Sequence, residues 1–121
     1  MKIAIPTENN NVAQHFGRCQ QYTLVDVENS KVTNIVVIDN PGHAPGAIPK
    51  FLNEKGCNLI ITGGMGQKAQ QFFEQFNISW IIGVQGDVKS VINDFINNNL
   101  IVGDSTCDHG EGKGTGYRDC H

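Results

Sequence analysis

The chain lacks three features that would place it at once in a common functional class. It has no cluster of lysine and arginine and a net charge of −3 over 121 residues, so we do not expect a duplex nucleic-acid binder, which needs clustered cations. No segment approaches the ~20 apolar residues of a membrane span. No apolar leader precedes the first strand-like segment. We therefore expect a cytoplasmic protein with no nucleic-acid or membrane partner.

Cysteine is also sparse for a disulfide-based fold. The four cysteines, Cys19, Cys57, Cys107 and Cys120, are scattered, whereas small secreted scaffolds are dense in paired cysteines. Reduced thiols are the better expectation. With 39% hydrophobic and 17% charged residues, the chain can fold, and its length suits one compact domain.

Apolar runs predict five strands, at residues 2–6, 20–27, 32–38, 57–62 and 79–84. The second and third strands form an antiparallel hairpin. Pro6 ends the first strand, and the polar run at 7–18 is expected to be loop. Residues 100–102 are a candidate short edge strand.

Three helices follow the hairpin, with apolar stripes that begin at Ile48, Ala69 and Val88. Pro49 fits the first turn of its helix, Asn77 ends the second, and Asp87 is placed to cap the third. This order predicts a three-layer α/β/α domain over residues 1–102, with a mixed five-stranded sheet that contains one antiparallel strand. The first strand should lie in the middle of the sheet. Residues 103–121 are expected to be a flexible tail rich in Gly, Cys and His.

Several chemically distinctive residues follow strands that should run parallel, so they should meet at the carboxyl edge of the sheet. Open α/β folds bind ligands at that edge. Cys57 begins a strand, so it should lie at the opposite edge as a structural thiol. The candidate site residues at the carboxyl edge are His15, Arg18, Cys19, His43, Gly63, Gly64, Met65 and Gly66.

Each of these candidates has both a functional and a purely structural interpretation. The "GGMG" turn before a helix favours an anion, but it is also a tight strand-to-helix turn. Imidazole and thiolate make His15 and Cys19 candidate metal ligands, and Arg18 suits an anion. Cys19 is equally well read as a small buried apolar residue, and His43 as an exposed residue of a Pro/Gly loop.

The motifs "HFGR", "YTLVDVE", "NPGHAPGAIPKFL", "GCNLIITGGMGQKAQQFF" and "ISWIIGVQGDVKSVINDF" together resemble the dinitrogenase iron-molybdenum cofactor biosynthesis family. The resemblance covers residues 1–102. It implies a ribonuclease-H-like fold and a protein that binds or carries an anionic metal-sulfur cluster, iron-sulfur or molybdenum-containing, and is not an enzyme. His15 corresponds to the cluster-facing histidine in the N-terminal loop. Other members of the family are similar to proteins that hold molybdenum-copper-sulfide clusters.

The end of the chain also resembles the tails of stand-alone family members. Cys107, His109, Cys120 and His121 supply ligand types that bind metal ions, although their spacing is not that of a zinc finger. A solvated tail that binds metal adventitiously is an equally good interpretation.

Two other functions remain as alternatives. A metal-dependent nuclease needs acids on the central strands, and the predicted first, fourth and fifth strands have none. A small-anion or nucleotide-binding regulatory module would use the glycine turn, with Asp87 as the acidic partner about 20 residues further along. No nucleophile motif supports a hydrolase.

The sequence therefore favours a cofactor-assembly accessory protein whose partners are cluster donor and acceptor proteins. We expect a monomer or a weak homodimer.

Overall fold

A computed structural model describes residues 1–17, 19–40, 47–97 and 100. Its strands are β1 (Lys2–Glu8), β2 (Asn11–Val12), β3 (Gln21–Glu28), β4 (Lys31–Asp39), β5 (Leu59–Ile61) and β6 (Ser79–Ile81). Its helices are α1 (Ala47–Glu54), α2 (Gln67–Gln75) and α3 (Val88–Ile96). None of the helices in this described part is long and apolar enough to cross a membrane.

The sheet has the predicted topology. Its main path runs in the order β4-β3-β1-β5-β6, so the first strand is central, with the hairpin on one side and the later strands on the other. β3 is antiparallel to both β1 and β4, whereas β5 pairs parallel with β1 and with β6. The fold class is therefore confirmed as an α/β fold with a mixed sheet.

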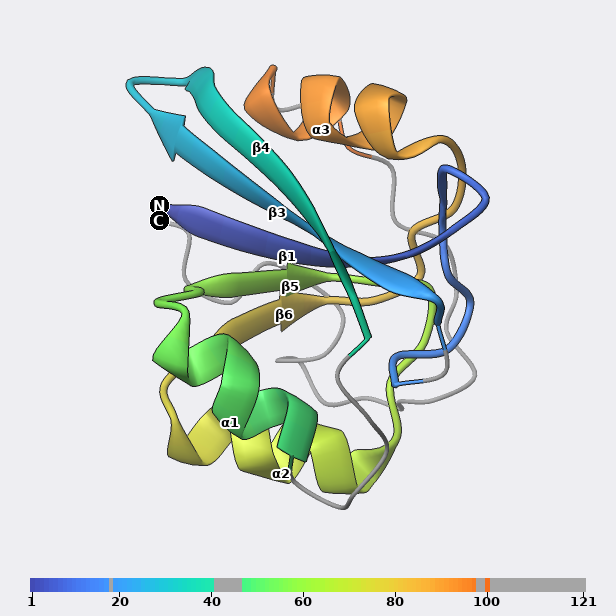
Figure 1. The fold of residues 1–121 in the computed structure, drawn as a ribbon, viewed down its shortest axis with the longest axis vertical. Helices are drawn as coiled ribbons and strands as arrows, with labels where there is room; N and C mark the ends of the chain where they lie inside the picture. The colour runs from blue at the N-terminus through green and yellow to red at the C-terminus, as the bar shows by residue number, and fades with distance from the viewer. Residues whose placement is uncertain (18, 41–46, 98–99, 101–121) are drawn as a thin grey trace.

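Two apolar clusters cover the two faces of this sheet, with α1 and α2 on one face and α3 on the other (Figure 1). Alternate residues of each strand supply the two clusters, because successive side chains of a strand point to opposite faces. In β1, for example, Ala4 faces α1 and α2, while Ile3 and Ile5 face α3. This arrangement gives the three layers expected from the sequence.

The prediction that residues 7–18 are entirely loop is wrong. β1 continues to Glu8, and the short strand β2 returns against it, so the sheet has six strands where five were predicted. The link is a tight turn at Asn9 and Asn10, whose φ values are 52° and 69°. Asparagine tolerates this left-handed backbone better than most residues, which makes such a two-residue hairpin turn accessible.

Pro6 lies inside β1 because its missing N–H is not needed there. Met1 and Val27 exchange backbone hydrogen bonds of 3.0 and 2.8 Å, which makes them a hydrogen-bonded pair of the antiparallel ladder. Such pairs alternate with non-hydrogen-bonded ones along the ladder. Pro6 pairs with Tyr22, five residues beyond the Met1 pair, and therefore occupies a non-hydrogen-bonded position. The proline did not have to end the strand.

The helix boundaries agree with the signals in the sequence. The Asp87 carboxylate accepts a hydrogen bond of 3.0 Å from the Ser90 amide, so it caps α3 as predicted. Asn77 follows α2 with φ of 60°, a conformation that cannot continue a right-handed helix. Pro49 lies in the first turn of α1.

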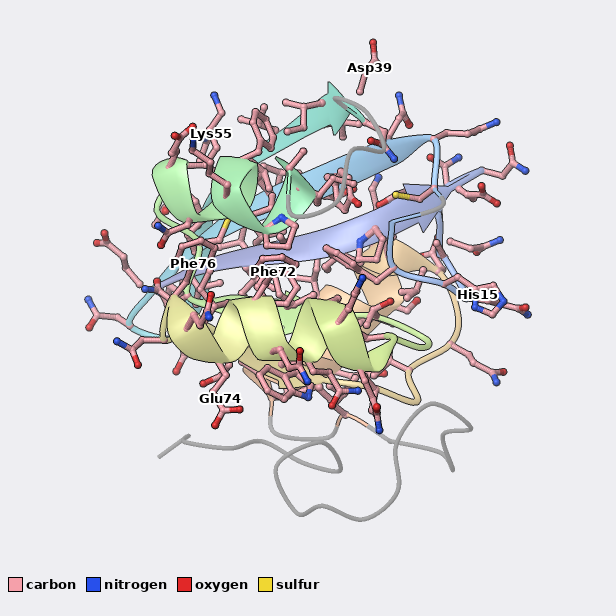
Figure 2. All side chains as sticks on the ribbon, turned by 90° about the horizontal axis from the view of Figure 1, so that it is seen from below. His15, Asp39, Lys55, Phe72, Glu74 and Phe76 are labelled. Carbon is pink, nitrogen blue, oxygen red and sulfur yellow. The ribbon has the colours of Figure 1, made fainter. Side chains whose placement is uncertain are left out.

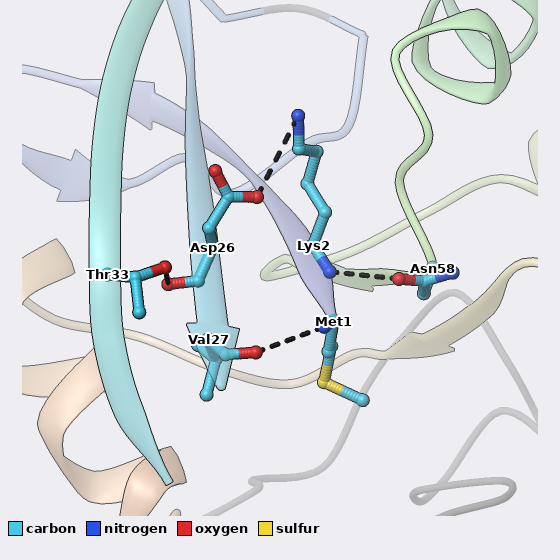
Figure 3. A network of polar contacts seen from close by, with 6 residues as sticks. All are labelled: Met1, Lys2, Asp26, Val27, Thr33 and Asn58. Carbon is cyan, nitrogen blue, oxygen red and sulfur yellow. Dashed lines mark hydrogen bonds and ion pairs between the residues drawn. The ribbon is translucent and has the colours of Figure 1, made fainter. Parts of the chain in front are cut away.

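Polar contacts join three strands at the amino edge of the sheet, opposite the predicted site (Figure 3). The Lys2 amide donates to the Asn58 side chain at 2.9 Å, and the Lys2 ammonium lies 3.8 Å from the Asp26 carboxylate. These contacts fix the start of β1 against β3 and the segment that leads into β5.

Candidate functional site

The site region is built around a loop, residues 13–16, that is joined to the turn after β5. The Phe16 amide donates to the Gly64 carbonyl at 2.9 Å, and the Gly63 amide donates to the Ala13 carbonyl at 3.1 Å. A Cβ on Gly63 would lie 2.9 Å from the Gln14 Cα, so only glycine allows this approach. The loop that carries His15 is thus held directly against the "GGMG" turn.

Phe16 anchors this loop in the core. Its ring centroid lies 5.7 Å from that of Tyr22 and 5.2 Å from that of Phe73, the second contact being edge-to-face. His15, the preceding residue, is exposed. In Figure 2 its side chain lies at the end of the molecule where α2 begins and points away from the ribbon, whereas Glu74 and Phe76 lie at the other end. Because Phe16 packs against the core, the adjacent His15 imidazole is held in place and exposed to solvent.

α2 begins directly after the glycine turn that holds this loop, and no side chain caps the start of the helix. Gly66 is its N-cap residue, and nothing lies within 4 Å of where a Cβ on Gly66 would stand. The Lys68 side chain, in the first helical turn, is exposed. Backbone N–H groups at a helix start carry partial positive charge and bind anions. The exposed His15 imidazole thus lies on a loop bonded to Gly63 and Gly64, and the uncapped start of α2 and the exposed Lys68 follow that turn in the chain.

Cys19 has a different environment, because it is buried with only 6% of its surface exposed. Burial raises the pKa of its thiol, and the neighbouring Tyr22 hydroxyl and Thr7 backbone oppose the rise only in part. The Asn40 amide donates to the Cys19 carbonyl at 2.9 Å and lies 4.0 Å from the sulfur. The thiol is therefore protonated at neutral pH in this conformation, and its role as a ligand remains a prediction.

Tyr22 lies beside Cys19 and is fully buried. Its hydroxyl lies beside the Cys19 thiol and the Gly17 backbone. Burial, and then the nearby thiol, raises the pKa of this phenol.

The structure brings together some of the predicted site residues. The loop that carries His15 meets Gly63 and Gly64 at the carboxyl edge, as the topology required, whereas the Met65 side chain is buried in the core and is not presented at this surface. Cys57 is buried near the start of β5, as expected for a structural thiol. The remaining predicted site residues lie outside the described residues, and they are Arg18, His43, Cys107, His109, Cys120 and His121.

Neither a nuclease site nor a free carboxylate for a ribose is found among the residues that the structure describes. β1 does carry an acid, Glu8, at its end, but no group of three or more His, Cys, Asp or Glu side chains gathers among the residues that the structure describes. The Asp87 carboxylate, which a nucleotide site would use for a ribose, is engaged as the cap of α3.

Sequence reasoning missed three residues of this region: Phe16, Lys68 and Tyr22. A signal existed for two of them, since an aromatic residue next to an exposed loop histidine is an evident anchor, and a lysine follows the glycine turn closely. No sequence pattern indicated that the Tyr22 hydroxyl would be buried beside the Cys19 thiol.

Comparisons with known proteins give a consistent picture. The family model described as "Dinitrogenase iron-molybdenum cofactor" matches residues 1–98. The protein MJ0580 of Methanocaldococcus jannaschii is 36% identical over 83 residues, which cover 64% of this chain and 70% of that protein.

Two solved structures extend the similarity to the fold. The crystal structure of PH0822 superposes with a TM-score of 0.80 at 35% identity and covers 84% of this chain and 94% of that one. The apo form of the orange protein from Desulfovibrio gigas superposes with a TM-score of 0.70 at 22% identity, covering 86% and 93% of the two chains. At that lower identity the likeness concerns the fold alone. By the match over residues 1–98, the chain belongs to the dinitrogenase iron-molybdenum cofactor family.

Proposed function

We propose that this protein is an accessory factor that binds an anionic metal-sulfur cluster as cargo and passes it to an acceptor, with no catalytic turnover of its own. The observation that carries the proposal is the position of His15. The loop that bears this exposed imidazole is hydrogen-bonded to Gly63 and Gly64, just before the uncapped start of α2.

The charge of the site suits such a cargo. The start of a helix carries roughly half a positive charge, spread over amides that point outward. Lys68 adds a full charge in the first turn, and its exposure keeps it free to follow the cargo. A cluster with bridging sulfides and net negative charge is stabilised by both. Sulfide-rich anions also accept hydrogen bonds from backbone amides.

The ligand set suits transfer more than permanent storage. Imidazole is a borderline ligand that binds iron, copper and related metals through its neutral form. One exposed imidazole together with backbone amides would hold a cluster reversibly, whereas resident iron-sulfur clusters are held by several cysteine thiolates. An acceptor protein could therefore displace His15 without unfolding the carrier.

The relatives support the same class of function. The family description names the iron-molybdenum cofactor. A structural relative is called the orange protein, and its structure is that of an apo form. Metal-sulfide clusters absorb visible light, so a colour on loading would distinguish cluster cargo from a colourless nucleotide.

The test is an anaerobic titration of the full chain with tetrathiomolybdate, and separately with a preformed iron-sulfur cluster, followed by visible spectroscopy and metal analysis. The wild type should take up one cluster per chain or fewer. His15→Ala should lose most of the uptake, while Gln14→Ala, which changes an exposed neighbour on the same loop, should keep it.

Two further variants separate the parts of the site. Gly66→Ser offers a hydroxyl that can cap α2, so it should weaken binding by competing for the amides without unfolding the helix. A chain that ends at Gly103 tests the Cys/His tail, and undiminished uptake would make the tail auxiliary. Equal uptake by wild type and His15→Ala would refute the site, and no uptake by either would refute carriage of these cargos.

A further inference from the structure

A groove of about 280 Å³ lies between the hairpin of β3 and β4 and the helix α3, on the α3 face of the sheet (Figure 1). Pockets that hold drug-sized ligands measure ~300–1,000 Å³, so this groove suits a smaller molecule. Strands, the β1–β2 turn and the start of α3 all contribute to its lining. The groove lies on the other side of the sheet from α2, whose start belongs to the proposed cluster site.

The strands give the groove a polar end and an apolar end. Thr7 pairs with Gln21 at the carboxyl end of the sheet, and one step back along the same face Thr23 pairs with Val37. Ile35 follows two residues further towards the amino end. All five side chains line the groove. The sheet wall therefore changes from polar to apolar away from the carboxyl edge.

The helix wall changes in the same direction. The Val88 amide donates to the Asn10 carbonyl at 3.0 Å, which places the start of α3 beside the β1–β2 turn at the carboxyl edge. Asp87 and Lys89 line the groove at this start, and Ile92 lines it one helical turn further along. A ligand that matches both walls has a polar head at the carboxyl edge and an apolar tail.

Two buried threonines determine which kind of polar group fits. The Thr7 hydroxyl lies 2.8 Å from the Ile5 carbonyl oxygen and 2.7 Å from the Thr23 hydroxyl. A carbonyl can only accept, so the single Thr7 proton goes to Ile5 and Thr23 must donate to Thr7. Thr23 is 4% exposed, and its oxygen accepts from no donor among the described residues. Towards the groove Thr23 therefore offers an acceptor, which selects a ligand with an N–H or O–H group.

The charges of the lining come as one pair of opposite sign. Among the described residues, Asp87 and Lys89 are the two ionisable side chains that line the groove. Oδ2 of Asp87 accepts from the Ser90 amide, which leaves Oδ1 for one further donor. A single oxygen is enough for an ammonium group, whereas the paired hydroxyls of a ribose would use both. The exposed Lys89 ammonium supplies the opposite charge.

We propose that this groove binds a free aliphatic α-amino acid. Such a molecule carries an ammonium and a carboxylate on one carbon, which matches the polar end, and a branched apolar side chain, which matches the other. Its ammonium donates to the Thr23 hydroxyl oxygen and to the Asp87 carboxylate. Its carboxylate faces Lys89, and its side chain packs against Ile35 and Val37.

The first experiment is a methyl NMR titration of the full chain with L-leucine. Saturable shifts should appear at the methyl groups of Ile35, Val37 and Ile92. The amine 3-methylbutylamine lacks the carboxylate and 4-methylpentanoate lacks the ammonium, so each should bind at least about fivefold more weakly than leucine. Equal affinities for the three compounds would overturn the proposal, as would saturable shifts confined to other methyl groups, or none at the solubility limit of leucine.

Thr23→Val tests the acceptor while it keeps the shape of the side chain. It should weaken leucine binding by about two- to tenfold, because the ammonium loses one hydrogen bond. Binding of 4-methylpentanoate, which has no ammonium, should not change. Thr33→Val makes the same substitution at an exposed position of β4 and should leave leucine binding unchanged. An equal loss for leucine and 4-methylpentanoate in Thr23→Val would contradict the role of the hydroxyl.

The two charges can be removed separately. Asp87→Ser keeps a helix cap without the charge, and it should weaken leucine and 3-methylbutylamine by about two- to fivefold. Lys89→Met should weaken leucine and 4-methylpentanoate to a similar degree, whereas Lys50→Met, at an exposed position of α1, should have no effect. The reverse pattern, or the same loss for all three compounds in both variants, would refute the assigned contacts.

His15→Ala separates this proposal from cluster carriage. Because the groove lies on the α3 face, leucine binding should be the same in this variant as in the wild type. A loss of leucine binding in His15→Ala would place the amino acid at the cluster site and overturn the groove.

Discussion

The two sides of the central strand β1 show how similar residues take on different roles. On one side, β5 and β6 are three residues long, and every residue of β5 is buried. On the other side, β4 has nine residues, most of them exposed, although its sequence is nearly as apolar. Composition alone does not separate Leu59–Ile61 from the segment that contains Ile35. What differs is the number of neighbours, because helices cover both faces of β5, while β4 has a partner on one edge alone among the described elements.

This difference indicates that the two sides serve different purposes. The β5 and β6 side is a rigid base that ends in the glycine turn against which the His15 loop is fixed. The β4 side is a hairpin that pairs with β1 through β3 and keeps apolar side chains exposed. Substitutions on the two sides should therefore have unequal effects on stability, and the predictions below start with the largest.

The strongest contrast is between two isoleucines. Ile60→Ala, at a fully buried position of β5, should lower the free energy of unfolding by about 2–5 kcal/mol, because it leaves a cavity in the core. Ile35→Ala, at a position that is 46% exposed, should lower it by less than about 1 kcal/mol. Urea unfolding at low protein concentration measures both without a contribution from self-association. Equal losses would show that β4 is as much a part of the core as β5.

The glycine turn gives the next contrast, between two positions that lie three residues apart. Gly63→Ser places a Cβ 2.9 Å from the Gln14 Cα, so the backbone must shift, and the free energy of unfolding should fall by about 1–3 kcal/mol. Gly66→Ser meets nothing within 4 Å and should be neutral or slightly stabilising. Thermal unfolding compares the two. A neutral Gly63→Ser would mean that the loop and the turn are not tightly joined.

Alkaline pH tests the burial at the start of β5. Burial raises the pKa of the Cys57 thiol from its ordinary value of 9.0 to about 11. Below pH 9 the thiol is protonated in both states, so pH has no effect through this group. Between pH 9 and 11 the unfolded chain loses the proton while the folded chain keeps it, so stability falls as the pH rises, by at most about 1.4 kcal/mol per pH unit.

The control is Cys57→Ala. At each pH, the free energy of unfolding of the variant is subtracted from that of the wild type, which isolates the titration of this thiol from that of every other group. That difference should be constant below pH 9 and should shift in favour of the variant above it. A difference that stays constant up to pH 11 would mean that the thiol is more accessible to water than its 4% exposure indicates.

The smallest effect concerns α3, which covers one face of the sheet. Asp87→Ala removes the side-chain oxygen that accepts from the Ser90 amide and should cost about 1 kcal/mol. Asp87→Ser should retain most of the capping, and Lys89→Ala, at an exposed position in the same helix, should have little effect. Chemical denaturation of the three variants checks this order, which an equal loss in Asp87→Ser and Asp87→Ala would contradict.

Much of the fold was predictable because the signals are local. Amphipathic stripes and caps such as Asp87 marked the helices, and the order of elements constrained the topology to a central first strand. The errors occurred where a local signal was ambiguous. Pro6 suggested an end to β1, but its place in the ladder made the missing N–H harmless. The turn at Asn9 and Asn10 was read as loop, because asparagine is common in both.

The sequence by itself determined the family, the order of the elements and the presence of His15 beside a glycine turn after a buried strand. Tertiary structure alone decided how these parts meet. It packed Phe16 against the core so that His15 faces solvent, buried Cys19 and so raised the pKa of its thiol, and left β4 with a partner strand on one edge alone among the described elements. The physical reason is that exposure, close approach and the pKa of a thiol depend on neighbours distant in the chain, and a local pattern does not contain those neighbours.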